Sequence, residues 1–373
     1  MAQIVLDSLT EGTGPYTLDL GKLKNRPNSR LTGGIMHAIW MMKRGGTEVL
    51  KVREASDPQP GANEVRIRVK ASGLNFADIM ARLGLYPAAP KPPCVLGYEV
   101  SGTIDQIGHQ VKEFSVGDRV VAMTPFGGHA DAVCVNSNRV VKLTSEVSFE
   151  AAASLPINYL TAQQLLMRMA NVQPGETILV HMAAGGVGLA LLQLSQMIGG
   201  IHVIGTASAS KHEIIRQNGC EYPIDYRNKD YVSEVRRITN GKGVDAVFDA
   251  LGGVDWKRGY NLLRPSGRLL AYGFANLNNG GKRNLLRIAR QLMSMPRVNP
   301  LKLMAKNRTV AGLTLSGLQA EPLMKDLKTL VEFCRTGTLK PVIDSRYPFS
   351  RVAEAHQRME QRKNIGKILL TPD

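Results

Sequence analysis

Residues 177–211 read TILVHMAAGGVGLALLQLSQMIGGIHVIGTASASK and predict the local structure on which the fold depends. A short β-prone run at 177–181 leads directly into a glycine-rich turn, and apolar residues at helical spacing follow the turn. A second β-rich run occupies 201–206. This strand–turn–helix–strand order is the context that a dinucleotide-binding fingerprint requires. The segment therefore predicts a dinucleotide site, with an ordinary structural turn as the alternative.

The turn has the spacing G-x-G-x-x-G, with Ala183 in the first place and Gly185 and Gly188 in the other two. Gly185 would let the backbone approach a pyrophosphate, and Gly188 would let the helix pack closely on the strand. Backbone N–H groups at the start of the helix would face the phosphates. Gly186 and Val187 lie between the two glycines and belong to the predicted contact surface.

The end of the second strand indicates which dinucleotide binds. An NAD site carries Asp or Glu about 20 residues after the glycines, on the ribose hydroxyls. Here residues 206–211 read TASASK, so the region from Thr206 contains no carboxylate that would repel a 2′-phosphate. Ser208 offers a hydroxyl to such a phosphate and Lys211 offers a positive charge. This composition favours NADPH over NADH.

Length and composition fit an α/β protein of two domains. A chain of 373 residues is long for one core. It contains no run of about 18 apolar residues that would predict a membrane span. The N-terminus lacks a secretory signal pattern, so we expect a cytoplasmic protein. The cysteines are scattered and indicate reduced thiols rather than disulfides or a structural zinc site; they are Cys94, Cys134, Cys220 and Cys334.

The net charge is +16, and the stretch 277–308 contains eight basic residues and no acidic one. Apolar residues interleave with the charges, so part of 282–308 is predicted to be a basic amphipathic helix. Such a helix can bind an anionic membrane surface as a peripheral contact, or an acidic partner. It can equally be a solvated face whose Arg stems cover a core. No stacking platform or recognition module accompanies the charge, so no nucleic acid is expected as a partner.

The pattern changes along the chain. Residues 1–34 lack periodicity and are predicted to be an N-terminal extension. From residue 35 short alternating strands predict an antiparallel β-domain. From residue 148 helical spacing begins, and strands alternating with helices follow. A lone late strand is predicted at 309–315, and the final strand at 365–370 is expected to return to the first domain.

Family motifs occur in a fixed order through residues 36–371. They include GLNFADIMARLGLYP (73–87), GYEVSG (97–102), NYLTAQ (158–163), HMAAGGVG (181–188), GTASASKHE (205–213), LLRPSGRLLAYG (262–273) and NIGKILL (364–370). Together they resemble the medium-chain dehydrogenase/reductase superfamily in its zinc-free quinone oxidoreductase branch. Several look most similar to the vesicle amine transport protein (synaptic vesicle membrane protein) homologues, a subgroup of that branch.

The resemblance implies a GroES-like β-domain over 35–157 and 319–373. It also implies a Rossmann domain with a doubly wound parallel sheet over 158–318, with NADPH bound between the two. It implies a homodimer in which strand 309–315 pairs with its twofold mate, which covers an otherwise unpaired edge. The vesicle subgroup is linked to membranes and phospholipid transfer. A membrane-associated phospholipid-binding or transfer protein on a reductase fold is therefore the alternative function.

The residues at the family's zinc positions indicate a zinc-independent reaction. By resemblance, Asn75 stands where zinc alcohol dehydrogenases have a Cys ligand, and Tyr98 stands where they have a His ligand. Neither is a normal zinc ligand, so Lewis-acid polarisation of the substrate is not expected. What remains is hydride transfer from NADPH to a quinone or an α,β-unsaturated carbonyl, in which conjugation spreads the developing negative charge.

The resemblance also implies roles at the reacting end of the coenzyme. Asn75 and Thr161 would lie against the nicotinamide or its ribose, and Phe274 would contact the nicotinamide through its backbone. Tyr86 could donate a proton to an enolate if it faces the cleft, and a surface tyrosine is the alternative. His129 is a weaker candidate, because a lone His beside glycines is more often a plain loop residue.

At the adenosine end, the resemblance implies that Ser208 and Lys211 hold the 2′-phosphate, with Tyr226 nearby. Asn364 and Lys367 match a C-terminal segment that approaches the cofactor in this branch. Each assignment has a structural alternative, such as a helix cap, a turn or a solvated side chain.

Overall fold

The computed structural model describes residues 34–277, 280, 285–296 and 298–373. They form two compact units, one built mainly from 34–157 and 316–373 and the other from 158–277 and 285–315. The second unit thus ends at 315, whereas the sequence predicts 318. The extension predicted at 1–34 lies outside the described residues except for Gly34, as do Lys282, Arg283 and Arg297 of the basic stretch.

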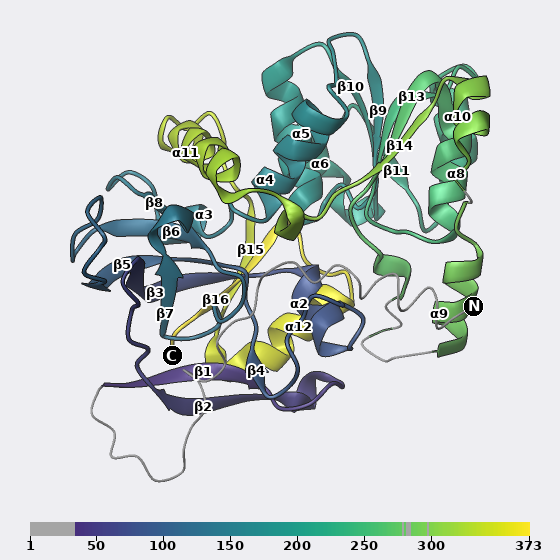
Figure 1. Cartoon of the computed structure of the whole chain (residues 1–373). Helices are drawn as coiled ribbons and strands as arrows, with labels where there is room; N and C mark the ends of the chain where they lie inside the picture. Colours follow the sequence, from purple (N-terminus) through teal and green to yellow (C-terminus); the bar gives the residue numbers. More distant parts are fainter. Residues whose placement is uncertain (1–33, 278–279, 281–284, 297) are drawn as a thin grey trace. The chain divides into compact units, whose positions relative to one another are not determined.

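The first unit contains two sheets (Figure 1). The smaller has the order β2-β1-β4, formed by β1 (Ile35–Met41), β2 (Leu50–Ser56) and β4 (Cys94–Val95). The larger has the order β15-β16-β3-β5-β6-β8, with β7 also paired to β3. Its strands are β3 (Glu64–Leu74), β5 (Glu99–Ile107), β6 (Arg119–Met123), β7 (Ala132–Asn136), β8 (Val140–Lys142), β15 (Ile343–Pro348) and β16 (Lys367–Thr371).

Alternation along β3 explains how the larger sheet forms its core. Val65, Ile67 and Val69 point inward and pack with apolar residues of β5, β6 and β7. Between them, Arg66 and Arg68 point outward and bind carboxylates, including that of Asp105. This period of two is the pattern of an antiparallel strand with one buried face.

The C-terminal segment completes the first unit. As the sequence predicts, the last strand returns to the first domain, since β16 pairs antiparallel with the end of β3 (Ile368 opposite Leu74). The helices of this unit are α2 (Phe76–Arg82), α3 (Phe149–Ala152), α11 (Ala320–Arg335) and α12 (Val352–Glu360). Neither β15 nor α12 is among the elements that the sequence predicts. In α12 only Val352, Ala355 and His356 are buried, so its apolar periodicity is weak.

The second unit contains a six-stranded parallel sheet with the order β11-β10-β9-β12-β13-β14. The strands are β9 (Thr177–Val180), β10 (His202–Ala207), β11 (Tyr222–Asp225), β12 (Val244–Asp249), β13 (Leu263–Ala271) and β14 (Thr309–Gly312). The helices are α4 (Asn158–Gln163, continued by a π-helix over Gln164–Met169), α5 (Gly186–Ile198), α6 (His212–Gln217), α7 (Tyr231–Ile238), α8 (Val254–Leu262), α9 (Leu285–Met293) and α10 (Pro300–Lys306).

This strand order confirms the predicted Rossmann domain. The chain starts at β9 and moves to one side through β10 and β11, then crosses to β12 and continues outward to β14. The order reverses between β9 and β12, and open α/β sheets bind ligands at the carboxyl ends of the strands beside such a reversal.

The late strand β14 lies at the edge of this sheet and pairs with β13 (Figure 1). It ends at Gly312, whereas the sequence predicts a strand to 315. Pairing of this edge with a second copy of the chain stays a prediction. Among the described helices, none is long and apolar enough to cross a bilayer.

One buried histidine in α12 makes the stability of the first unit depend on pH. His356 is buried, and its Nδ1 has no hydrogen-bond partner. Burial, and then the charges of Arg82 and His129, lower the pKa of His356 well below its usual value. The folded protein therefore keeps His356 neutral, whereas the unfolded chain takes up a proton near a pKa of about 6.5. The resulting stability is complete above that pH and is lost as the pH falls below it.

We predict that lowering the pH from 7.5 to 5.5 decreases the free energy of unfolding. In His356→Leu this decrease should be smaller by about 1 kcal/mol. The reason is that one pH unit below the pKa of the unfolded chain changes the free energy of unfolding by about 1.4 kcal/mol. Denaturant unfolding at the two pH values measures the effect. His109→Gln, at an exposed position, should retain the full decrease. Equal pH dependence in wild type and His356→Leu would contradict the prediction.

Candidate functional site

The glycine turn lies at the carboxyl end of β9 and is held by β10. The Ala183 N–H donates to the Thr206 carbonyl at 3.0 Å, and the Gly185 N–H donates to the Met182 carbonyl at 2.8 Å. Gly185 is the N-cap residue of α5, and no side chain caps this helix. The first N–H groups of α5 therefore have no side-chain partner, which is the arrangement that binds phosphate groups at helix N-termini.

Steric constraints at the glycines differ. A Cβ at Gly188 would overlap the Met182 carbonyl oxygen and approach the Ala183 backbone to 2.7 Å, so only glycine lets α5 pack this closely on β9. A Cβ at Gly186 would overlap the amide of Asn158 in α4. A Cβ at Gly185 would meet only the Met182 oxygen, at 3.2 Å, so packing alone scarcely requires glycine there. An approaching ligand is the better reason for that glycine.

The residues predicted for the 2′-phosphate lie directly after β10. Ser208 is buried and is the N-cap residue of a 3-10 helix over Ala209–Lys211, and the Lys211 N–H donates to the Ser208 carbonyl at 2.9 Å. Tyr226 follows the neighbouring strand β11 and is 36% exposed. Because β10 and β11 are parallel, with Ala207 opposite Asp225, these residues extend from the same edge of the sheet.

One carboxylate that is not among the predicted site residues lies in this region. Asp225 ends β11, where it accepts hydrogen bonds from the Arg227 N–H at 3.1 Å and from Asn228 Nδ2 at 2.6 Å. Burial raises the pKa of Asp225, but these hydrogen bonds outweigh it and leave the pKa below its usual value. The ionised carboxylate is thus held by the β11–α7 loop and by the backbone N–H of Ala209 in the loop after β10.

The side chains of Thr206 and His181 lie beside the glycine turn and contact each other. Thr206 Oγ1 lies 3.2 Å from His181 Nδ1 and 3.3 Å from the Met182 nitrogen. Thr206, which the sequence predicts to contact the cofactor, therefore has hydrogen-bond partners within the protein. His181 Nε2 lies 4.0 Å from Oδ2 of Asp249, the last residue of β12. Burial lowers the pKa of His181 and raises that of Asp249. The pair sits at the strand reversal between β9 and β12.

Two further predicted residues lie in the second unit. Phe274 follows β13, and its ring packs edge-to-face on Trp256 with centroids 4.9 Å apart. The same ring closely covers Gly252, where a Cβ would lie 2.9 Å from it. Thr161 is buried on α4, which packs against α5. Ala183, Gly185, Gly186, Val187, Gly188, Thr206, Ser208, Lys211, Tyr226, Phe274 and Thr161 therefore all belong to this unit.

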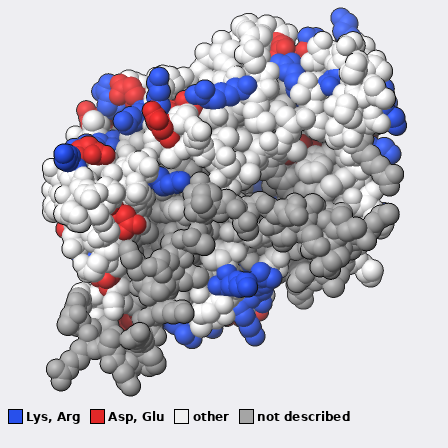
Figure 2. Space-filling model, in the orientation of Figure 1, with Lys and Arg blue, Asp and Glu red and all other residues white. Residues whose placement is uncertain are grey.

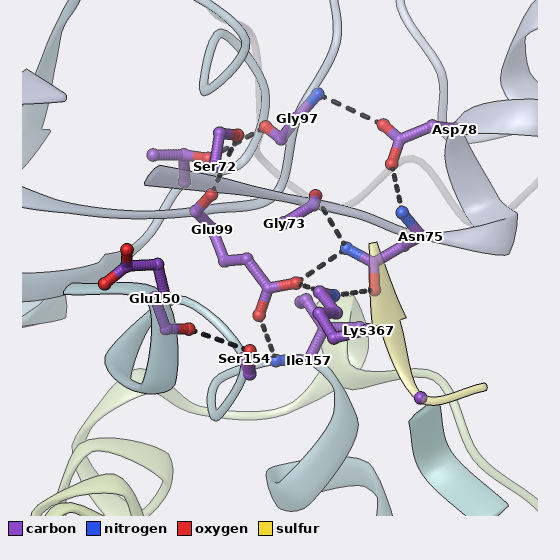
Figure 3. A network of polar contacts seen from close by, with 12 residues as sticks. Ser72, Gly73, Asn75, Asp78, Gly97, Glu99, Glu150, Ser154, Ile157 and Lys367 are labelled. Atoms are coloured by element: carbon purple, nitrogen blue, oxygen red, sulfur yellow. Dashed lines mark hydrogen bonds and ion pairs between the residues drawn. The ribbon is translucent and has the colours of Figure 1, made fainter. Parts of the chain in front are cut away.

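In the first unit, Asn75 belongs to a buried polar network (Figure 3). Asn75 is the N-cap residue of α2, and its N–H donates to Asp78 Oδ2 at 2.8 Å. Lys367 Nζ donates to Asn75 Oδ1 at 2.7 Å and forms an ion pair with Glu99. The predicted cofactor residue Lys367 is only 2% exposed, so its ammonium is held within this unit. Asn364 Nδ2 donates to the Gly366 carbonyl at 3.0 Å.

Tyr86 lies in an aromatic group on the same unit. Its ring meets Tyr98 edge-to-face at 6.2 Å between centroids, and Tyr98 lies 5.2 Å from Phe126. Tyr86 packs partly buried against the apolar cluster around β1 and β16. The Tyr98 hydroxyl is buried without a hydrogen-bond partner, and burial raises the pKa of Tyr98.

His129 is not a plain loop residue. It is buried, with Nδ1 2.8 Å from Ser72 Oγ and Nε2 3.4 Å from Asp78 Oδ1. The ring of His129 therefore contacts the first turn of α2, the helix that has Asn75 as its N-cap residue.

Zinc does not fit the residues at the family's metal positions. An amide (Asn75) and a phenol (Tyr98) stand there, and zinc sites are built from thiolates, imidazoles and carboxylates. Within the described parts of the chain, no group of three or more His, Cys, Asp or Glu side chains could hold a metal ion.

Comparisons with known proteins agree with this architecture. Residues 61–145 match the alcohol dehydrogenase GroES-like domain and residues 218–370 the zinc-binding dehydrogenase family. The chain is 44% identical over 339 residues to the Danio rerio synaptic vesicle membrane protein VAT-1 homolog, covering 90% of this chain and 70% of that protein. It is 33% identical over 340 residues to human quinone oxidoreductase, covering 90% and 98%.

Among solved structures, the Escherichia coli quinone oxidoreductase complexed with NADPH matches with a TM-score of 0.81 and 31% identity, covering 90% of this chain and all of that one (100%). The glycine turn and the strand order of the second unit agree with these similarities in sequence and structure. The chain therefore belongs to the medium-chain dehydrogenase/reductase superfamily of oxidoreductases, in the group that contains quinone oxidoreductases and the VAT-1 homologues.

Proposed function

We propose that this protein is a zinc-independent, NADPH-dependent oxidoreductase that reduces quinones or α,β-unsaturated carbonyls by hydride transfer. The observation that carries the proposal is the uncapped N-terminus of α5 at Gly185, with Ser208 and Lys211 after the adjacent strand. Two similar proteins support the proposal. One is human quinone oxidoreductase, and the other is the Escherichia coli quinone oxidoreductase, which is complexed with NADPH.

The coenzyme supplies the hydride when bound, and the chain supplies binding and orientation. The backbone from Ala183 to Gly188 holds the pyrophosphate through N–H groups of α5. Ser208 and Lys211 bind the 2′-phosphate by charge-assisted hydrogen bonds, and Tyr226 borders the adenosine.

At the nicotinamide end, Asn75, Thr161 and the backbone of Phe274 fix the ring or its ribose. Conjugated acceptors suit a site without a metal, because their π-system spreads the charge that hydride addition creates. Tyr86 is the proposed proton donor for the enolate product. Asn364 supports the segment that carries Lys367. We further propose that the edge of β14 pairs with a second copy in a homodimer.

We predict that the purified protein oxidises NADPH in the presence of members of a panel of simple quinones and enones, with a higher kcat/KM for NADPH than for NADH. The loss of absorbance at 340 nm measures this rate. Incubation with a zinc chelator should leave the rate unchanged, because the residues at the metal positions are not zinc ligands. Absence of NADPH oxidation across the panel, or equal use of both coenzymes, would refute the proposal.

We predict that Ser208→Ala combined with Lys211→Ala raises the Kd for NADPH about tenfold or more, because hydrogen bonds to a charged group contribute about 1.5–3 kcal/mol. The Kd for NADH should not change, because NADH lacks the 2′-phosphate. Coenzyme fluorescence titration gives both constants. Lys257→Ala, at an exposed position on α8, is the matched control and should leave both unchanged. An equal loss of affinity for the two coenzymes would contradict a 2′-phosphate contact.

A second function is favoured by α9 and α10. Both helices expose large apolar side chains: Leu286 is 85% exposed, Met293 80%, Leu301 73% and Met304 71%. Lys302 and Lys306 are exposed beside them, and residues 285–308 contain no acid. Figure 2 shows lysine and arginine side chains at the edge of the molecule where Figure 1 draws α10. Exposed apolar residues among cations suit a peripheral contact with an anionic, phospholipid-containing membrane.

We predict that the protein co-sediments with vesicles containing an anionic phospholipid and not with vesicles of neutral phospholipid alone. Lys302→Glu with Lys306→Glu should weaken this binding at least tenfold, because each basic residue near an anionic surface contributes about 1 kcal/mol. Lys257→Glu with Lys242→Glu is the control for net charge. If the control weakens binding equally, α10 is not the contact.

A further inference from the structure

Three segments that are distant in the sequence meet at the carboxylate of Glu99, the first residue of β5 (Figure 3). Its Oε1 accepts a hydrogen bond from Asn75 Nδ2 at 2.8 Å and pairs with the ammonium of Lys367 in β16. Its Oε2 accepts the backbone N–H of Ile157 at 2.7 Å. Ile157 directly precedes α4, the helix that carries Thr161. Glu99 thus has a partner on each oxygen.

All three charged or amide side chains of this group are buried, with Glu99 0%, Lys367 2% and Asn75 6% exposed. A buried ion pair is a poor source of stability, because desolvation of both charges offsets their attraction. A buried pair of this kind can instead fix the orientation of a neighbouring polar group. The neighbouring group here is the amide of Asn75, which touches both charges.

The hydrogen bonds leave the Asn75 amide one orientation. Nδ2 donates its two hydrogens to the Gly73 carbonyl, at 3.2 Å, and to Glu99 Oε1. Oδ1 accepts from the Lys367 ammonium. A flipped amide would place its NH₂ group against the ammonium and its oxygen against two acceptors. Both hydrogens of Nδ2 are used, so Asn75 cannot donate to a ligand; Oδ1, which also faces the Asp78 N–H in the capping box of α2, is its only acceptor atom.

We propose that Glu99, together with Lys367, is a positioning residue that fixes Asn75 as a hydrogen-bond acceptor for the nicotinamide half of the coenzyme. The matching groups on that half are a ribose hydroxyl and the carboxamide N–H. The inference rests on the proposed function and adds to it a direction for the hydrogen bond and two residues that control it.

The test compares Glu99→Gln, Lys367→Met and the double variant Glu99→Gln/Lys367→Met with wild type. Glu360→Gln is the matched control, because Glu360 pairs with the buried Arg82 in the same unit and does not touch Asn75. For each protein the Kd for NADPH, the Kd for 2′,5′-ADP, kcat and the melting temperature are measured. 2′,5′-ADP contains the adenosine and 2′-phosphate and lacks the nicotinamide half.

We expect the single variants to raise the Kd for NADPH and to lower kcat, each by about tenfold or more, because the acceptor is displaced from its position. Their Kd for 2′,5′-ADP should stay within about twofold of wild type. The double variant buries no unpaired charge and should regain melting temperature without regaining NADPH affinity, because Asn75 still lacks its anchors. Glu360→Gln should lose melting temperature and keep both affinities and kcat.

Unaltered NADPH affinity and kcat in Glu99→Gln and in the double variant would overturn the positioning role, and so would an equal loss of affinity for 2′,5′-ADP. A loss of NADPH affinity in Glu360→Gln that matches the other variants would also overturn it, since stability alone would then explain the effect. A wild-type protein that binds neither NADPH nor 2′,5′-ADP overturns the proposed function itself. The two failures are therefore distinguishable.

Discussion

The backbone of α5 approaches the end of β9 so closely that no side chain fits at Gly188. This packing constraint sets the direction of α5 and leaves its N-terminus open beside the strand reversal. The hydroxyl and backbone of Thr206 hold the intervening turn from the neighbouring strand β10. The open N–H groups of α5, the loop after β10 and the loop after β12 consequently lie at one edge of the sheet, where α/β folds bind their ligands.

In the first unit, a buried polar network fixes the position of the Asn75 side chain. The larger sheet of this unit brings β3, β5 and β16 side by side. Glu99 lies in β5, Lys367 lies in β16, and Asn75 directly follows β3, so the three side chains meet in one buried polar group. Buried polar groups need hydrogen-bond partners, and Glu99, Lys367 and Asn75 supply them to one another. The proposed coenzyme contacts of the second unit thus depend on backbone geometry at the start of α5, and the proposed contact of the first unit depends on the orientation of the Asn75 amide.

The two proposed functions depend on separate features of the chain. The proposed coenzyme site consists of residues at or just after the carboxyl ends of strands, such as Gly185 and Ser208. The proposed membrane contact is built from exposed residues of α9 and α10, such as Leu286 and Met304, which contribute nothing to the core. One protein can therefore carry both functions, and substitutions in α10 should separate them from each other.

The sequence alone determined the features that depend on local spacing. The glycine turn between 177–181 and 201–206, the alternation in β3 and the Ser208–Lys211 loop are encoded by neighbours in the chain, where periodicity and turn chemistry act directly. The family motifs added the order of the domains and the identity of the superfamily. A helix such as α12, with few apolar residues, has too weak a periodicity to be predicted in this way.

Only the tertiary structure decided which distant residues become partners. Lys367 and Glu99 are 268 positions apart, and Lys367 and Asn75 are 292 apart. Spacing carries no information about contacts at such separations, because sheet pairing brings these residues together. The same reason explains why the sequence does not predict the contact of Lys367 with Glu99 or that of His129 with α2. Charge in an otherwise apolar strand, as in KILLT at 367–371, was the one signal in the sequence that a buried partner existed.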